Sequence, residues 1–109
     1  MYDDIKAYIE GKVGSEYEAA SEFIVLGQKM VTAANNGQSK NRELLENAIK
    51  EVDDSYLRYA KIPLESYSRG EDFDDNFFFK VRGTYRNIQS ELTEKVCKLA
   101  KEDRYRKTG

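Results

Sequence analysis

The 109-residue sequence contains no histidine. Histidine is the side chain that most often acts as a general base near neutral pH, and it is the commonest zinc ligand. Its absence excludes Ser–His and Cys–His nucleophile pairs within one chain, and it excludes the Glu-x-x-His signature of ferritin-like di-iron bundles. We therefore expect no metal and no cofactor, and we expect that the protein is not an enzyme.

Cysteine and long apolar runs are also scarce. The lone Cys97 cannot form an internal disulfide, which favours a reducing compartment. The longest apolar run, residues 23–26, is far shorter than the roughly 18 residues that suggest a membrane span. The start of the chain, residues 1–4, is acidic where a signal peptide would be basic. The sequence thus predicts a cytoplasmic protein with no membrane partner.

The residues that are abundant point to helices. Charged residues make up 35% of the chain, against the usual quarter or so, and hydrophobic residues make up 39%. Amphipathic helices with one buried stripe and wide solvated faces produce this balance, whereas eight Tyr and five Phe argue against disorder. The length fits a single helical domain over residues 1–109.

The first helical stretch runs from about residue 3 to residue 34. Gly11 and Gly14 interrupt it, and residues 15–18 (Ser-Glu-Tyr-Glu) have the pattern of a capping box. Because the apolar phase continues across the break, we expect either one helix kinked near 11–15 or two nearly collinear helices. The apolar stripe consists of Ile5, Ile9, Val13, Ala20, Ile24 and Val31.

The second helix is expected from about residue 40 to residue 61. A turn over residues 35–39, with Gly37 available for a left-handed C-terminal cap, precedes it. Since proline disfavours α geometry in the residue before it, we expect the helix to stop ahead of Pro63. Residues 62–71 would then form the longest irregular segment.

The third helix carries the strongest pattern. Acidic residues crowd its start and basic residues crowd its end, which matches the helix dipole. Joined by short turns, the helices predict an all-α, antiparallel three-helix bundle, up-down-up, with four helices if the first stretch breaks near 11–15. The near-heptad seam of the third helix consists of Phe78, Val81, Tyr85, Ile88, Leu92, Val96 and Leu99.

Charge is distributed unevenly along the chain. Residues 1–79 hold 9 basic and 16 acidic residues, whereas residues 80–109 hold 9 basic and 4 acidic residues. An antiparallel bundle would lay the two halves side by side, so internal complementarity is the favoured interpretation. A basic tail for nucleic acid is the alternative, but Glu91, Glu94 and Glu102 interrupt the basic face and argue against direct nucleic-acid binding.

Three consecutive phenylalanines, at positions 77–79, are the most informative surface feature. If Phe78 lies on the seam, Phe79 points away from it by about a third of a turn, and Phe73 is displaced similarly. One interpretation is that the 62–71 segment folds over these rings. The other is that Phe79 is an aromatic anchor for a partner, surrounded by acids.

The acidic residues and an outlying tyrosine complete the candidate site. The cluster at 71–75 could dock into a basic groove of a partner, or it could serve only to cap a helix. Tyrosine is favoured at interfaces because its ring is large and its tip is polar. The predicted partner-binding residues are Tyr67, Glu71, Asp72, Phe73, Asp74, Asp75 and Phe79.

The leading functional prediction is a non-enzymatic protein-binding module, a regulator or inhibitor that docks on a larger protein. Small, acidic helical domains of this kind are frequent among phage and mobile-element proteins, including inhibitors of bacterial defence nucleases, although this is an analogy of size and character only. The alternatives are a self-associating assembly subunit, such as a homodimer, and a nucleic-acid-binding accessory protein.

Overall fold

The computed structural model describes residues 2–36 and 42–108, with side chains as far as residue 102. Every regular element within these ranges is an α-helix, as the sequence predicts. The expected turn around Gly37 and the side chain of Tyr105 lie outside the described residues. The helices are α1 (Tyr2–Ile9), α2 (Ser15–Asn35), α3 (Arg42–Ser68) and α4 (Asp75–Thr108).

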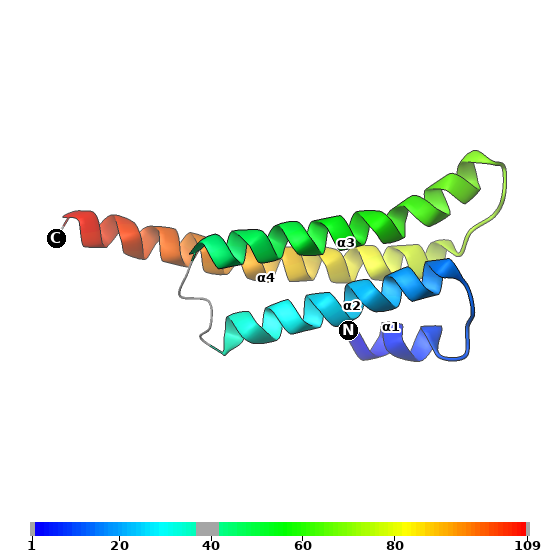
Figure 1. Cartoon of the computed structure of the whole chain (residues 1–109), viewed down its shortest axis with the longest axis horizontal. Helices are drawn as coiled ribbons and strands as arrows, with labels where there is room; N and C mark the ends of the chain where they lie inside the picture. Colours follow the sequence, from blue (N-terminus) through cyan, green and yellow to red (C-terminus); the bar gives the residue numbers. More distant parts are fainter. Residues whose placement is uncertain (1, 37–41, 109) are drawn as a thin grey trace.

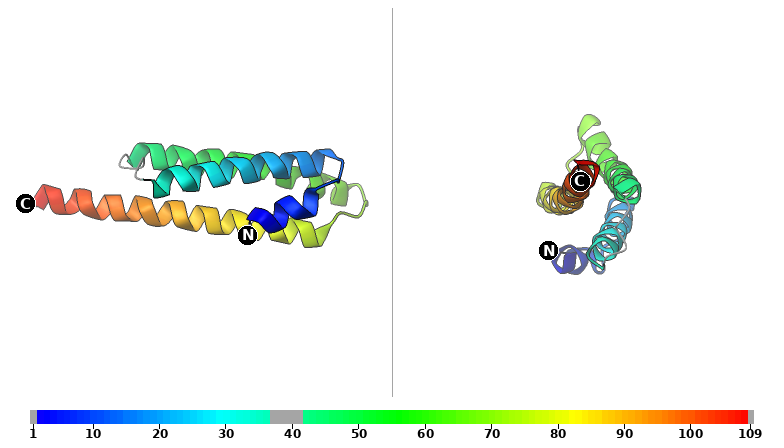
Figure 2. Two further views of the ribbon diagram at one scale, coloured as in Figure 1. Left: turned by 90° about the horizontal axis from the view of Figure 1, so that it is seen from below. Right: turned by 90° about the vertical axis from the view of Figure 1, so that its left-hand side faces the viewer.

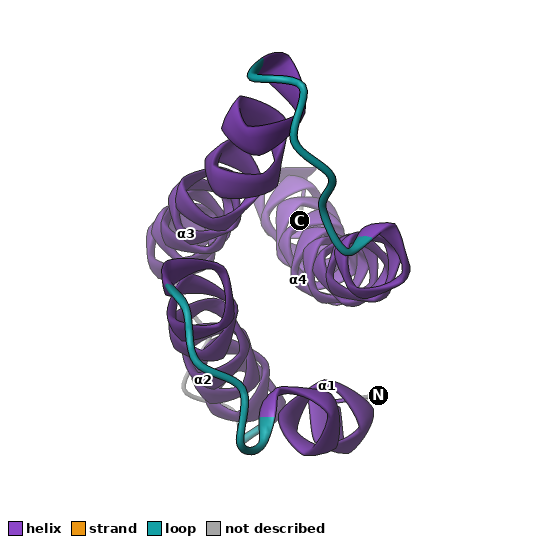
Figure 3. Ribbon diagram, turned by 90° about the vertical axis from the view of Figure 1, so that its right-hand side faces the viewer, coloured by secondary structure: helices purple, strands orange, loops and turns teal. Residues whose placement is uncertain are grey.

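The three long helices pack side by side as an antiparallel bundle (Figure 1). α4 is the longest helix, and its C-terminal part extends beyond the ends of α2 and α3 (Figure 2), giving a rod of 59 × 26 × 17 Å. Seen along this rod, the short α1 adds a fourth member beside α2 and α4 at one end only (Figure 3). The predicted bundle is confirmed, in its four-helix form.

The arrangement of α1 differs from the prediction of a kinked or nearly collinear pair. α1 folds back antiparallel to α2 (Figure 1), and Ile5 is buried in the core. Gly11, at φ +79°, and Gly14, at φ +150°, make the reversal with backbone conformations that residues with a Cβ rarely adopt. Ile5 and Ile24 of the predicted stripe are both buried because the two helices face the same core, not because they share an axis, whereas Val13, in the connection, is 94% exposed and is not part of the stripe.

The predicted capping box at residues 15–18 does not form. The carbonyl of Gly14 accepts the N–H of Glu18 at 3.1 Å, so that Gly14 occupies the N-cap position and makes no side-chain hydrogen bond. Ser15 is already the first helical residue. The left-handed conformation at Gly14 therefore sets the start of α2 one residue earlier than the serine pattern predicts.

The prediction that the second helix ends before Pro63 is wrong. α3 continues through Pro63 to Ser68, and the proline ring is fully buried. The missing N–H leaves the Tyr59 carbonyl without its usual helical donor, but burial of the ring offsets this cost. α3 curves away from the rest of the bundle toward its C-terminal end (Figure 1), as a helix containing proline commonly does.

α3 ends at Gly70 in a Schellman motif. The Glu71 N–H donates to the Ser66 carbonyl at 2.9 Å, and the Gly70 N–H donates to the Tyr67 carbonyl at 3.0 Å. Gly70 has φ +76°, the left-handed conformation that this motif requires. Between α3 and α4, the irregular residues are 69–74. The predicted irregular segment of 62–71 is therefore mostly helix.

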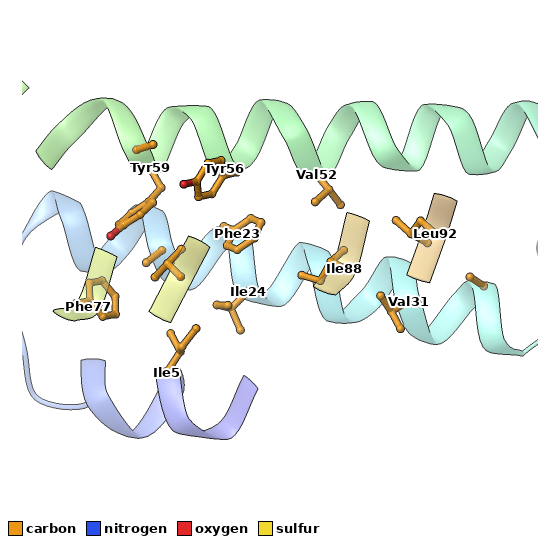
Figure 4. Packing of buried hydrophobic residues seen from close by; sticks show 14 of the residues in the cluster. Ile5, Phe23, Ile24, Val31, Val52, Tyr56, Tyr59, Phe77, Ile88 and Leu92 are labelled. Carbon is orange, nitrogen blue, oxygen red and sulfur yellow. The ribbon is translucent and has the colours of Figure 1, made fainter. Parts of the chain in front are cut away.

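The core lies between α2, α3 and α4, with Ile5 of α1 closing one end (Figure 4). The predicted seam is confirmed at Val81, Ile88 and Leu92, which are fully buried. At the start of α4 the seam is wrong by one residue. Phe77 is the fully buried ring and Phe78 is only half-buried, because Phe77 fits among the rings of Tyr8, Tyr17 and Tyr59.

Among the described side chains, which end at residue 102, the expected pairing of the acidic and basic halves does not appear as ion pairs. Those seen between described side chains join sequence neighbours: Arg42–Glu46, Lys61–Glu65 and Arg69–Glu71. The end of α4, which holds much of the basic charge, extends past the acidic helices (Figure 2). In the part of the chain that the structure describes, no helix is long and apolar enough to cross a membrane.

Candidate docking surface

Four aromatic rings form a continuous row at the end of the bundle where α3 passes into α4. Tyr67 meets Phe73 edge-on with ring centroids 6.0 Å apart, Phe73 meets Phe78 at 5.8 Å, and Phe78 meets Phe79 at 5.9 Å. These distances are typical of interacting aromatic pairs. The four rings, Tyr67, Phe73, Phe78 and Phe79, are called the aromatic surface below.

Local structure places each ring. Tyr67 lies in the last turn of α3, and the left-handed Gly70 then reverses the chain so that Phe73 returns beneath Tyr67. Phe78 and Phe79 follow in the first turn of α4. Sequence reasoning missed Phe78 as part of this surface. Gly70, a typical C-terminal helix signal, could have revealed that Tyr67 is helical.

The two ends of the aromatic surface are open to solvent. Tyr67 is 69% exposed and Phe79 is 60% exposed, whereas Phe73 and Phe78 are half-buried. Phe78 also packs on the buried Tyr59 ring, with centroids 6.2 Å apart. The connection between α3 and α4 thus covers Phe78 through Phe73 and leaves Phe79 uncovered. The 62–71 segment therefore does not cover Phe79, and the ring that lies against Phe78 from the connection is Phe73, which is outside that segment.

The four predicted acids do not act as one cluster. Glu71 forms an ion pair with Arg69 at 3.0 Å, while Asp72 and Asp75 are exposed. Asp74 is used inside the fold: its Oδ1 accepts the Phe77 N–H at 3.1 Å, which caps α4, and its Oδ2 accepts the Tyr8 hydroxyl. Only Asp72 and Asp75 therefore offer free carboxylates beside the aromatic surface.

Asp74 belongs to a polar group beneath α1. The hydrogen bond from Tyr8 holds the pKa of Asp74 below its usual range, with help from the Phe77 N–H and from Lys12 and Lys80. Burial, and then the charge of Asp74, raise the pKa of Glu16 above its usual range. Two carboxylates with pKa values displaced in opposite directions resemble an acid–base pair. Here, however, both oxygens of Asp74 already hold structural hydrogen bonds.

The same group fixes α1 against the bundle. The Tyr8 ring stacks on Phe77 with centroids 5.1 Å apart, and the Lys12 ammonium lies 3.5 Å from the Tyr8 ring centroid. Such stacking and cation–π contacts contribute on the order of 1 kcal/mol each. The contacts that attach this short helix to the bundle account for the perturbed pKa values of Asp74 and Glu16.

Other groups with reactive chemistry are solvated. The carboxylates of Glu43, Glu46, Glu51 and Asp54 lie on exposed faces of α3, and Cys97 is exposed. Among the described residues no group of three or more potential ligands is placed to hold a metal ion.

Comparison with protein-family models, curated proteins and solved structures finds no match for this chain.

An apolar hollow lies at the end of the bundle opposite the aromatic surface. It measures about 360 Å³ and lies between α2 and α3, with Met30, Ala34, Leu45 and Ala48 in its lining. Leu44, 57% exposed, stands at its rim. None of the predicted site residues lines it, so it provides a natural control for experiments on the aromatic surface.

Proposed function

We propose that this protein is a non-enzymatic protein-binding module of the cytoplasm, a regulator or inhibitor that docks on a larger protein through the aromatic surface. The observation that carries this proposal is the exposure of Tyr67 and Phe79 at the two ends of one continuous row of rings. Single exposed apolar side chains are common on protein surfaces, whereas a contiguous row of rings with exposed ends is typical of an interaction site.

The chemistry of the surface suits protein recognition. Tyrosine and phenylalanine dominate the centres of protein interfaces, and polar groups surround them. Leu64, 52% exposed and three residues before Tyr67 on α3, extends the apolar area. Asp72 and Asp75 add negative charge at its edge, which favours a partner with basic residues around an apolar contact.

Mimicry of nucleic acid is less well supported. A mimic needs carboxylates that are free and regularly spaced, as phosphates are. Glu71 is paired with Arg69, and Asp74 is occupied by Tyr8 and the start of α4. We therefore favour an apolar anchor with a modest acidic rim, and mimicry remains the second form of the same proposal.

Affinity capture from the native host with the full chain as bait tests this proposal. We expect a specific partner that is retained by wild type and lost with Tyr67→Ser, since truncating an interface anchor costs about 2 kcal/mol or more. Leu44→Ser is the matched control, because Leu44 is similarly exposed but lies at the opposite end. A partner retained equally by wild type and Tyr67→Ser, or lost equally with both variants, would contradict docking at this surface.

A further inference from the structure

Gly83, in the middle of the first half of α4, has no role in the fold. A Cβ built there meets nothing within 4 Å, whereas a Cβ at Gly27 of α2 would lie 2.4 Å from the Ile88 Cδ1 atom. Close packing of α2 on α4 thus explains Gly27. Glycine in a helix interior costs up to about 1 kcal/mol relative to alanine, and at Gly83 no contact within the chain offsets that cost.

The missing side chain leaves a hollow on the surface beside Phe79. It measures about 240 Å³ and lies between α1 and α4, with Ile5, Gly83 and Thr84 in its lining and Phe79 at one side. Phe79 precedes Gly83 by one helical turn, so the exposed ring and the hollow lie next to each other on the same side of α4. The exposed Phe79 ring and this hollow, whose lining also includes Asp4, Lys80 and Asn87, therefore share one small surface.

We propose that this face of α4 binds a second copy of the chain. In a two-fold interface the same patch is used twice, so that a residue i that contacts j is matched by j contacting i. An axis between Phe79 and Gly83 makes the two α4 helices antiparallel, and the Phe79 ring of each copy enters the hollow beside Gly83 of the other. The absence of a side chain at Gly83 lets the two helices approach closely.

Charge on the same face fits this pairing. Asp75 precedes Phe79 by four residues and Arg86 follows it by seven, so all three share one side of the helix. When Phe79 lies opposite Gly83 of the second copy, Asp75 lies level with Arg86 and Asn87 of the second copy. Among the described side chains, neither Asp75 nor Arg86 has an ion-pair partner within its own chain. The two-fold axis forms this contact twice.

This inference goes beyond the proposed function and limits it: with Phe79 in the dimer interface, the exposed ring that remains for the larger partner is Tyr67. It assigns Phe79 to the second copy and leaves Tyr67 and Phe73 for the larger partner. The two surfaces adjoin through Phe78, so a dimer would present two docking surfaces on either side of the joined Phe79 rings.

Sedimentation velocity over a concentration series tests the dimer. We expect the mass of wild type to rise from 12.6 kDa toward twice that value with concentration. Phe79→Ser removes the projection and Gly83→Leu fills the recess, and each should weaken dimerisation by about tenfold or more. Because the space at Gly83 is open and leucine favours the helix, Gly83→Leu should keep or raise the thermal midpoint of the dilute protein. Tyr67→Ser should leave dimerisation unchanged.

Charge exchange tests the orientation. Asp75→Arg and Arg86→Asp should each weaken dimerisation, and the double variant should restore it, as expected for residues in direct contact. A chain that stays at 12.6 kDa at every concentration overturns the inference, as does a dimer that survives both Phe79→Ser and Gly83→Leu. Failure of Tyr67→Ser to affect a larger partner would instead remove the proposed function and leave the dimer standing.

Discussion

At the scale of single residues, two core tyrosines differ in whether their hydroxyl groups are hydrogen-bonded. Tyr56 and Tyr85 stack in parallel with centroids 4.1 Å apart, and the Tyr85 hydroxyl donates to Asp53 Oδ1 at 2.7 Å. Burial, with the contribution of Asp53, raises the pKa of Tyr85 to about 12. The Tyr59 hydroxyl is buried without a hydrogen-bond partner, and burial raises its pKa still further.

These two hydroxyls should respond in opposite ways to removal. Tyr85→Phe deletes a made hydrogen bond and leaves the part-buried Asp53 short of a donor, so it should cost about 0.5–1.5 kcal/mol or more. Tyr59→Phe removes an unpartnered polar atom from the core and should leave the free energy of unfolding unchanged or slightly raised. Denaturant titration of both variants measures the difference. Equal losses would mean that Tyr59 has a partner, such as a buried water.

The carboxyls of Glu16 and Asp74 should give opposite pH dependences. The pKa of Glu16 is raised in the folded state, so its stabilising contribution is greatest when it is protonated and declines as pH rises from its unfolded pKa through its folded pKa. The pKa of Asp74 is lowered, so its contribution is present above the unfolded pKa and declines as pH falls toward its folded pKa.

Glu16→Gln, a neutral side chain of the same shape, should therefore be more stable than wild type at about pH 7 and equal to it near about pH 3. Because Glu16 is partly exposed, solvent screening keeps the gain below about 1 kcal/mol. Asp74→Asn should be less stable at neutral pH, with the loss shrinking in acid. Thermal midpoints measured across this range decide. A gain for Glu16→Gln that does not depend on pH would show that its charge is not the cause.

At the scale of helices, the sequence predicted what is periodic and missed what is decided over long range. Val81, Ile88 and Leu92 recur at helical spacing within one element, so their burial was predictable. Pro63 within α3 was not, because burial of its ring by distant residues outweighs a local rule. The fold-back of α1 depends on the dihedral angles of Gly11 and Gly14, which the sequence permits but does not specify.

The candidate site follows the same division. The exposure of Phe79 was expected, although the seam was placed one residue too late: Phe79 lies about half a turn from the buried Phe77, so helix geometry turns it away from the core in either case. Which of the four acids are free could not be predicted. Asp74 is held by Tyr8, which is 66 residues away from it in sequence. A contact of this kind leaves no periodic signal.

Two helical glycines provide a paired test of packing. Gly27→Ala places a Cβ against Ile88 of α4 and should cost about 1–3 kcal/mol through overpacking. Gly83→Ala meets open space and should stabilise the dilute monomer by up to about 1 kcal/mol through helix propensity. Thermal unfolding of both variants measures these effects, and Ile88→Val should recover part of the loss at Gly27. Destabilisation by Gly83→Ala would mean that an unseen neighbour fills that space.

At the scale of the whole molecule, the bundle is a rod with chemically different ends. One end carries the aromatic surface with Asp72 and Asp75, whereas α4 extends beyond the bundle at the other end (Figure 2). Two of the four acids at the first end are used within the fold: Asp74 caps α4 and holds α1, and Glu71 is paired with Arg69. The molecule therefore offers a partner more aromatic contact than net charge at this end.

Binding of a larger partner should accordingly depend only weakly on salt. Exposed charges are screened over about 10 Å at 0.1 M salt, whereas burial of rings is largely indifferent to it. With only Asp72 and Asp75 free beside the rings, we expect the dissociation constant to change by less than about tenfold between about 0.05 and 0.5 M salt. A surface that imitates phosphates would lose several orders of magnitude, because many charge contacts act together. Titration of the captured partner across this range separates the two forms of the proposal. Asp72→Asn removes one free carboxylate and leaves the rings in place, so it should change the affinity less than Tyr67→Ser does. A steep salt dependence combined with a large effect of Asp72→Asn would favour mimicry over aromatic anchoring.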